Sequence, residues 1–414
     1  MVPLQRKPWA AKFALVLLLC FLPIAVGICS WFASLRDRKW SAFIARLDEL
    51  RAQSEHPAPA RLSFDRELHP GNAWDDYILA QPWRPGRPPV LIRIAPFIER
   101  RPEADRAEAE SLVARYAASI ELISSGARRR DAGLSGLKVE AVGQSAYDVA
   151  RLCIAKARFL SEAGYTSDAL ELLADVCMYG GDIAHTGRGR DGSTGLNVLR
   201  IAFWEMRDMV QSREIAEADL LKLDHRLQKL DEGFPDAADD VRNDLLELGS
   251  LILREDQSGE MHHHVPGRTR RRWRYLFSSR LQAASAFSIA DQLVHRALEA
   301  RKLPFREEQR VAQAISRDQE ASNEPLLGTL SSLAGYQTIR WTRADLRLLR
   351  FAVHYRVTGE TLDLDSPFGK KIQSQFTEGS LLAWHPTMFN QPPKSGPTKY
   401  VFPYTIEVPR RPAK

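Results

Sequence analysis

The longest uncharged stretch of the chain, residues 13–35, reads FALVLLLCFLPIAVGICSWFASL. Lys12 precedes it, and a charged cluster that begins at Arg36 follows it. A helix needs about 20 apolar residues to cross the hydrocarbon core of a bilayer, and aromatic residues such as Trp31 and Phe32 favour the interface. The stretch therefore predicts a single N-terminal transmembrane helix, in contact with the lipid bilayer through residues 13–35.

Basic residues at Arg6, Lys7 and Lys12 precede this stretch, as in a signal sequence. The stretch is longer than the apolar region of a cleaved signal peptide, which has about 7–15 residues, and no small-residue cleavage site follows it. We therefore expect an uncleaved signal anchor preceded by a basic tail at residues 1–12. A basic tail favours a soluble body on the outer side of the membrane.

The composition is that of a folded protein. Of the 414 residues, 58 are lysine or arginine and 52 are aspartate or glutamate, which gives a formal net charge of +6 at pH 7. An apolar content of 44% is enough for a hydrophobic core. Because acidic and basic residues are mixed along the chain, no nucleic-acid partner is expected.

The segment after the anchor is predicted to connect it to a larger body. Residues 36–56 place apolar side chains three and four positions apart, which indicates a helical stalk. Residues 57–101 are rich in proline and are expected to form a linker or a strap. Within this part, Val90-Leu-Ile-Arg-Ile is typical of a short strand or an extended strap.

The larger body is expected to be helical with a small β-rich end. Residues 102–357 predict an all-helical domain, and residues 358–414 predict a C-terminal cap with strands near 371–376, 380–384 and 400–408. The fold class is therefore mainly α, with a helical bundle or a short helical-repeat body. The predicted helices lie near 143–163, 167–180, 194–211, 216–231, 236–254, 275–301, 305–318 and 342–356.

One helical hairpin, residues 148–181, resembles a tetratricopeptide repeat. Small residues at Ala157 and Ala169 would let two helices approach closely, and Gly164 would form the turn between them. The alternative is an ordinary antiparallel helix pair within a bundle, since a stacked array needs about three repeats.

Cys153 and Cys177 lie at similar distances from the turn of this hairpin. Antiparallel partners at matched distances could form a disulfide outside the cytoplasm. The alternative is a pair of buried thiols that pack as small apolar side chains.

A histidine-rich segment is the candidate metal site. Glu260, His262 and His264 offer carboxylate and imidazole ligands, although consecutive side chains diverge and no further ligand motif is present. The alternative is a solvated loop. No cofactor is predicted.

The densest basic run follows this segment and is a candidate site for an anion or a lipid headgroup. Its alternative is a basic flank of a loop before a helix. The run consists of Arg268, Arg270, Arg271, Arg272 and Arg274.

Residues 180–195 contain many glycines and are predicted to connect two helices as a flexible loop. Asp182 and His185 in this segment are the candidate catalytic pair, because a carboxylate and an imidazole can share acid–base work. No nucleotide-binding or nucleophile-elbow motif accompanies them.

Several short motifs give the chain a resemblance to known proteins. The motifs are Asn72-Ala73 with Tyr77, Tyr355 with Thr358-Gly359, Asp365 with Pro367-Phe368-Gly369-Lys370, and Val408-Pro409-Arg410. In this order they resemble a group of bacterial single-pass, membrane-anchored proteins with a helical body and a short C-terminal cap, whose activity is unknown. The cap is also similar to the C-terminal sheet of type II secretion pseudopilins. This chain departs from these patterns by having Ser366 inside the Asp-Pro-Phe-Gly-Lys motif and Leu382-Ala-Trp-His-Pro where the pseudopilins carry a Tyr-Ser…Gly-Asp turn.

These observations predict a protein of the bacterial inner (cytoplasmic) membrane, with its body on the periplasmic or outer side. We expect it to act as a binding or structural component of the cell envelope through its helical body, with a protein partner there and no evident catalytic activity. The alternative is an anchored hydrolase that acts on an envelope polymer or peptide, with or without a metal.

Overall fold

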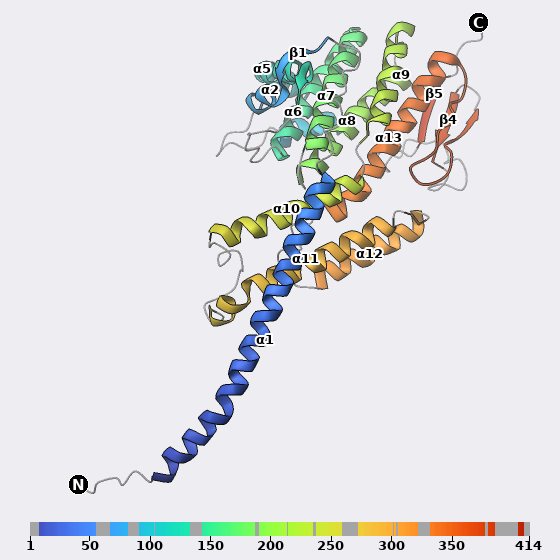
Figure 1. The fold of residues 1–414 in the computed structure, drawn as a ribbon. Coiled ribbons are helices and arrows are strands. Elements are labelled where there is room, and N and C mark those ends of the chain that lie inside the picture. The colour runs from blue at the N-terminus through green and yellow to red at the C-terminus, as the bar shows by residue number, and fades with distance from the viewer. Residues whose placement is uncertain are drawn as a thin grey trace. The chain divides into compact units, whose positions relative to one another are not determined.

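The computed structural model shows a mainly helical protein with a small C-terminal antiparallel sheet (Figure 1). The chain forms two compact units. Unit 1 contains Met1–Glu55, Leu245–Leu293 and Asn323–Thr329, and unit 2 contains the remainder. The residues that the structure describes are 8–54, 67–81, 91–102, 104–132, 143–186, 190–212, 214–234, 237–258, 272–300, 302–303, 305–321, 332–376, 380–385 and 405–409.

Unit 1 is built around helix α1 (Pro8–Ser54), together with parts of α10 (Ala237–Ser258) and α11 (Arg272–Ala300). Leu47 of α1 is fully buried, and the Phe43 ring meets Phe287 with centroids 4.9 Å apart. Gly249 of α10 leaves room for these side chains, because a Cβ there would lie 2.5 Å from Leu47 Cδ1 and 2.9 Å from Phe287 Cε2. Because α1 runs without a break from Pro8 to Ser54, the predicted anchor at residues 13–35 and most of the predicted stalk at residues 36–56 belong to one continuous helix.

Among the helices of the described residues, none combines the length and the hydrophobicity needed to cross a membrane. The transmembrane helix expected at residues 13–35 stays a prediction.

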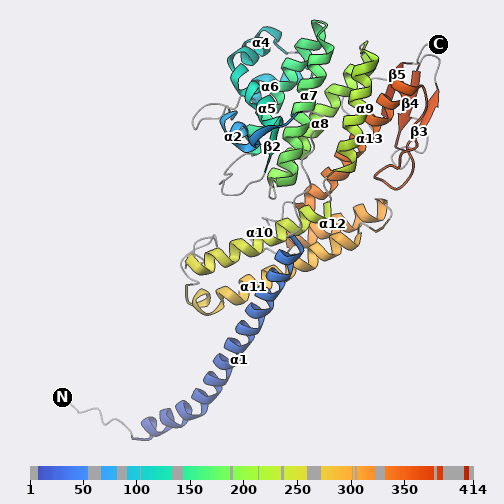
Figure 2. The ribbon, with the colours of Figure 1, turned by 45° about the horizontal axis from the view of Figure 1, so that its top comes forward.

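Unit 2 begins with short elements, which lie beside the first of its longer helices (Figure 2). Its short elements are β1 (His69–Asn72), α2 (Ala73–Leu79), α3 (Leu91–Ile98), α4 (Arg106–Arg115), α5 (Ala117–Ala127) and β2 (Arg129–Asp131), with β1 and β2 parallel. The longer helices are α6 (Gly143–Glu162), α7 (Thr166–Thr186), α8 (Arg190–Ser212), α9 (Glu217–Glu232), α12 (Phe305–Ala321) and α13 (Ser332–Thr358). The strand or strap expected at Val90 to Ile94 is wrong, because residues 91–98 form α3.

The α6–α7 hairpin was correctly placed by its sequence. Gly164 has a φ of +90°, which favours glycine, and its turn is closed by a hydrogen bond from Tyr165 N–H to the Leu160 carbonyl. Whether the hairpin belongs to the tetratricopeptide class remains an interpretation of its sequence.

The flexible loop predicted at residues 180–195 is wrong for most of its length. Helix α7 continues to Thr186 and α8 begins at Arg190, so that Gly180, Gly181, Gly192 and Gly195 lie inside the two helices. A Cβ on Gly195 would lie 2.4 Å from Ala184 N and 2.6 Å from the Gly180 carbonyl oxygen. Glycine is therefore required here for the close approach of two helix backbones, which outweighs its poor helix propensity.

The close approach of α7 and α8 predicts opposite effects of one substitution at two glycines. Gly195→Ala should lower the free energy of unfolding by about 1–3 kcal/mol, because the added methyl group overpacks the crossing. Gly181→Ala is the matched control, since nothing lies within 4 Å of its Cβ position, and it should be neutral or stabilise the protein by up to about 1 kcal/mol. Denaturant unfolding followed by circular dichroism measures both. Equal losses would contradict the backbone crossing.

The C-terminal cap is a three-stranded antiparallel sheet in the order β3 (Gln373–Phe376), β4 (Ser380–Trp384), β5 (Thr405–Pro409). Its strands match the predicted positions, and every residue of β4 is buried. Before the sheet, the Ser366 hydroxyl accepts a hydrogen bond from Phe368 N–H and lies 2.7 Å from His385 Nδ1. His385 Nε2 lies 3.2 Å from the Ala344 carbonyl oxygen of α13, so that one fully buried imidazole joins the sheet, the turn and the helix.

Burial lowers the pKa of His385 from 6.5 to about 4. The folded protein therefore holds the neutral imidazole, whereas the unfolded chain takes up a proton near pH 6.5. The stabilisation is fully present above about pH 6.5 and is lost as the pH falls toward 4, by up to about 3 kcal/mol.

This linkage can be measured from the free energy of unfolding between pH 7.5 and 4. We expect the decrease in wild-type protein to become shallower in His385→Gln, because glutamine has no proton to bind in this range. His295→Gln, at an exposed histidine of unit 2, is the control and should keep the wild-type slope. Parallel slopes for the wild type and His385→Gln would contradict the prediction.

Candidate functional site

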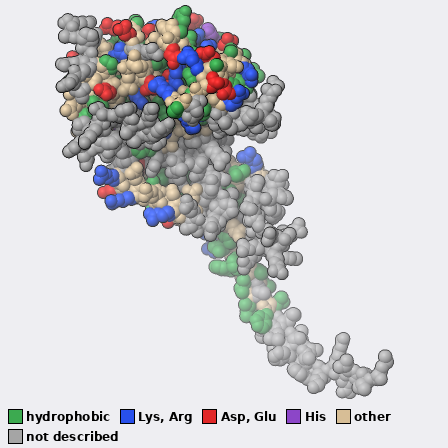
Figure 3. All heavy atoms as spheres, turned by 180° about the vertical axis from the view of Figure 1, so that it is seen from behind, with side chains coloured by type: hydrophobic (Ala, Val, Ile, Leu, Met, Phe, Trp, Pro, Cys, Tyr) green, Lys and Arg blue, Asp and Glu red, His purple; other side chains and the backbone are tan. Residues whose placement is uncertain are grey.

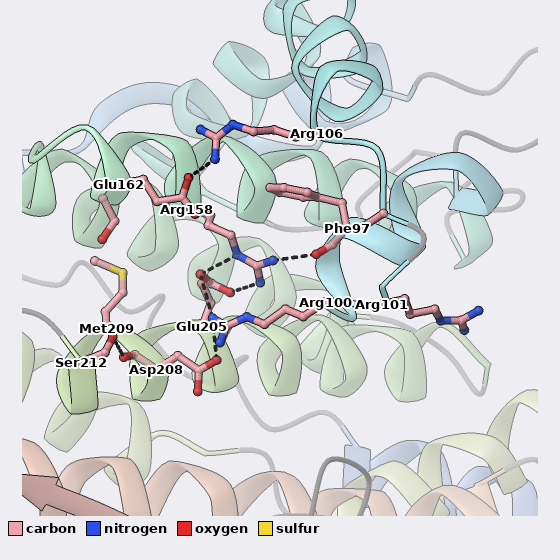
Figure 4. A pocket seen from close by; sticks show the side chains of 12 residues that line it. Phe97, Arg100, Arg101, Arg106, Arg158, Glu162, Glu205, Asp208, Met209 and Ser212 are labelled. Carbon is pink, nitrogen blue, oxygen red and sulfur yellow. Dashed lines mark hydrogen bonds and ion pairs between the residues drawn. The ribbon is translucent and has the colours of Figure 1, made fainter. Parts of the chain in front are cut away.

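A cleft of about 430 Å³ opens in unit 2 between the α3–α4 connection, α6 and α8 (Figure 4). Its lining combines arginines and carboxylates with a few apolar and hydroxyl side chains. The residues that matter for its chemistry are Phe97, Arg100, Arg106, Arg158, Ser161, Glu162, Glu205, Asp208 and Met209.

The floor of the cleft is an ion pair between Arg158 of α6 and Glu205 of α8. The Arg158 guanidinium donates through Nε to Glu205 Oε1 at 3.1 Å and through Nη2 to Oε2 at 2.5 Å. Its Nη1 donates to the Phe97 carbonyl oxygen at 2.7 Å, at the end of α3. Both charged side chains are less than a tenth exposed. This bidentate geometry is the strong form of the arginine–carboxylate pair, and it fixes three helices around the cleft.

One side of the cleft is formed by Arg100 and Asp208. Arg100 Nη2 lies 2.8 Å from Asp208 Oδ2 and 4.0 Å from Glu205 Oε1. Burial raises the pKa of the Asp208 carboxyl above its ordinary value, and the Arg100 charge opposes that rise. Arg100 has a φ of 52° and is the one non-glycine residue with a positive φ in the described ranges. Such a conformation is strained and persists only where the surroundings hold it.

The opposite side is formed by Arg106 and Glu162. Arg106 Nη1 donates to Glu162 Oε2 at 2.5 Å, and its guanidinium lies over the Phe159 ring at 5.0 Å. The Phe159 ring in turn packs against Phe97, with centroids 5.0 Å apart. Arg101 also contributes to the lining, but Figure 4 shows its guanidinium pointing away from the other labelled side chains.

Ser161, a residue of the lining, has a buried hydroxyl group. The residue is 5% exposed, and its hydroxyl oxygen has no hydrogen-bond partner among the described residues. A buried hydroxyl without a partner costs about 1–3 kcal/mol. The described residues therefore leave a donor and an acceptor unused beside the cleft.

The candidate catalytic residues Asp182 and His185 lie one turn apart on α7, outside this cleft. Asp182 is buried and accepts a hydrogen bond from Tyr77 OH at 2.8 Å. His185 Nδ1 lies 2.8 Å from the Gly181 carbonyl oxygen, and Nε2 lies 3.2 Å from that of Gly233. The described contacts of both side chains tie helices and loops together.

Cys153 and Cys177 are both buried, and neither forms a disulfide among the described residues. Burial raises the pKa of the Cys153 thiol, so that its reactive thiolate form is disfavoured.

The remaining predicted sites lie beyond what the structure describes. Glu260, His262, His264, Arg268, Arg270 and Arg271 fall outside the described residues, and Arg272 and Arg274 are described only as part of the α11 backbone. No group of three metal-ligating side chains occurs among the described residues.

A second buried carboxylate, Asp231 of α9, holds three arginines of α13. Arg343 Nε, Arg347 Nε and Arg350 Nη1 donate to its oxygens at 3.0, 3.0 and 3.2 Å. Arg347 also donates to the Asp365 carbonyl oxygen, which joins the cap to the same cluster.

The sequence motifs did not predict the cleft, but two charged residues on apolar helix faces could have indicated it. Arg158 follows Ile154 by four positions and Glu205 precedes Met209 by four, and both apolar neighbours are buried. A charged residue on the apolar face of a helix must find a buried partner. The partner itself lies 47 residues away and cannot be identified from local spacing.

The Arg158–Glu205 pair predicts strong coupling between two substitutions. Arg158→Met and Glu205→Leu should each lower the free energy of unfolding by about 3–5 kcal/mol, because each leaves one buried charge unpaired. The double variant should be more stable than either single variant, since no buried charge remains. A double-mutant cycle from urea unfolding measures this coupling, and additive losses would contradict it.

Comparison with known proteins gives no relative from which a role could be transferred. No family model matches the chain, and neither a curated protein nor a solved structure is significantly similar to it. The residues themselves are thus the basis of any functional conclusion.

Proposed function

We propose that this protein is a membrane-anchored binding component of the bacterial cell envelope, held in the inner membrane by residues 13–35 and acting through its helical body. The observation that carries the proposal is the uncharged stretch of 23 residues. As a helix it would be about 35 Å long, which suits a hydrocarbon core of about 30 Å.

The exposure of apolar side chains supports the anchor. Along the described part of α1 before Leu35, apolar side chains face outward (Figure 3). Each of the large ones is more than half exposed: Phe21, Leu22, Ile24, Val26, Ile28, Trp31 and Phe32. Exposed apolar surface of this extent is typical of an interaction with lipid or with another protein.

The cleft supports the binding role of the body. It combines paired charges, the Ser161 hydroxyl and the apolar side chains of Phe97, Ala104 and Met209 in one concave site, which is the usual composition of a ligand pocket. The hydrolase alternative has less support, because Asp182 and His185 bond to Tyr77 and to backbone carbonyls. The basic residues before the apolar stretch favour a body on the periplasmic or outer side.

Membrane fractionation tests the anchor. The full chain should sediment with membranes, resist alkaline carbonate and be released by detergent. The double variant Ile24→Arg with Val26→Arg should move to the soluble or aggregated fraction, because each arginine near the helix centre costs about 2.5–3.5 kcal/mol on insertion.

The matched control is Leu221→Arg, which adds the same charge at an exposed position of α9 and should leave the protein in the membrane fraction. Protease added to the outer face should digest the body. Recovery of the wild type in the soluble fraction, or release by carbonate, would overturn the anchor.

A further inference from the structure

We propose that the cleft between α3, α6 and α8 binds a small organic anion, whose carboxylate or phosphate group is held by Arg100, Arg106 and the Ser161 hydroxyl. The inference rests on the proposed binding role of the body but not on the membrane anchor. It is carried by the exposure of the charges, by the free hydroxyl and by the shape of the cleft.

The mouth of the cleft presents guanidinium groups more than carboxylates. The side chains of Arg100 and Arg106 are 56% and 57% exposed, whereas those of Asp208 and Glu162 are 29% and 30% exposed. An incoming ligand therefore meets the arginines first. A basic ligand would have to displace an arginine to reach Asp208 or Glu162. The greater exposure of the arginines therefore favours an anionic ligand.

Both arginines keep donors for a ligand. A guanidinium has five N–H donors in a planar fork. The described ion pairs of Arg100 use Nη2, and those of Arg106 use Nε and Nη1. The remaining donors suit the planar or tetrahedral oxygens of a carboxylate or a phosphate.

Ser161 supplies an independent indication of a ligand. Ser161 is 5% exposed and belongs to the lining of the cleft, and its buried hydroxyl oxygen has no partner among the described residues. An oxyanion that enters the cleft would accept the hydrogen bond that the protein leaves unmade. This hydroxyl lies on α6, three positions after Arg158 and one before Glu162.

The place of Arg100 after α3 directs its side chain toward the cleft. Its positive φ belongs to the turn that ends this helix, which a hydrogen bond from Arg101 N–H to the Pro96 carbonyl oxygen closes, and the Asp208 contact holds the side chain toward the cleft (Figure 4). Phe97 and Met209 give the cleft an apolar part that can contact the body of the ligand. A volume of about 430 Å³ suits a small molecule or a short peptide end.

Calorimetric titration of the full chain in detergent tests the inference with three probes. The first is N-acetyl-trialanine with a free carboxylate, the second is the same peptide with a C-terminal amide, and the third is inorganic phosphate. We expect the acid to bind at least about tenfold more tightly than the amide, because charge-assisted hydrogen bonds are lost with the carboxylate. Competition by phosphate would show that the oxyanion alone is recognised, whereas its failure to compete would assign the site to carboxylates.

Three variants connect the binding to the cleft. Arg100→Gln and Arg106→Gln should each weaken binding of the acid about tenfold or more, and Ser161→Ala should weaken it to a smaller extent. Arg296→Gln is the matched control, because Arg296 is also about half exposed and paired, with Asp318, outside the cleft. Unfolding curves that match the wild type show that the arginine variants keep the fold.

Equal binding of acid and amide, wild-type affinity in both arginine variants, or no binding of any probe at millimolar concentration would each overturn the proposed ligand. These outcomes leave the fractionation result unaffected, so that failure of the ligand and failure of the anchor are distinguished.

Discussion

The guanidinium of Arg158 is the interaction on which the helical body around the cleft depends. From α6 it reaches the Glu205 carboxylate on α8 and the last carbonyl groups of α3. The final carbonyls of a helix have no partner within the helix and carry partial negative charge. A buried cation that satisfies them and is itself balanced by a buried carboxylate fixes the positions of all three helices at once. The eight-residue helix α3 is also held by the buried Ile94 and by the packing of Phe97 against Phe159.

A buried carboxylate paired with arginines also occurs at Asp231, elsewhere in unit 2. A buried carboxylate is costly unless several donors satisfy it, and the three arginines of α13 provide them. The arginines recur at positions 343, 347 and 350, which places them on one face of the helix. Because Arg347 also holds the Asp365 carbonyl group, the cap is tied to the same buried charge. Buried ion pairs of this kind add little net stability over apolar replacements, but the loss of one partner is strongly destabilising.

Periodicity was sufficient to predict the long helices but not the contacts between them. The helix at 143–163 and the strand at 380–384 were placed almost as observed, because apolar spacing and turn residues act locally. The strand prediction for Val90 to Ile94 was wrong because β-branched residues on their own favour strands. In the structure, the buried Ile94 packs as part of helix α3. The loop prediction at residues 180–195 failed for a related reason. The helical state of Gly195 depends on a backbone contact with α7, which local sequence does not show.

The candidate cleft could be predicted even less completely. Arg158 and Glu205 are recognisable as charges on apolar helix faces, but their pairing joins residues 47 positions apart. The positive φ of Arg100 has no signal in its sequence, because glycine and asparagine are the usual residues there. The sequence motifs directed attention instead to Asp182 and His185, which lie outside the cleft, and to His262 and His264, which lie outside the described residues.

The contact between Ser366 and His385 in the cap illustrates how far a pair of side chains can be interpreted. Ser366 and His385 are 19 residues apart and lie 2.7 Å from each other, in the arrangement of a nucleophile and its base. The imidazole is fully buried, however, and its other nitrogen is bonded to the Ala344 carbonyl oxygen. The Ser366 hydroxyl also accepts from Phe368 N–H and thereby shapes the turn that follows it. Both side chains are buried, so their contact is explained by packing. Each residue provides a hydrogen-bond partner that the other needs in order to be buried.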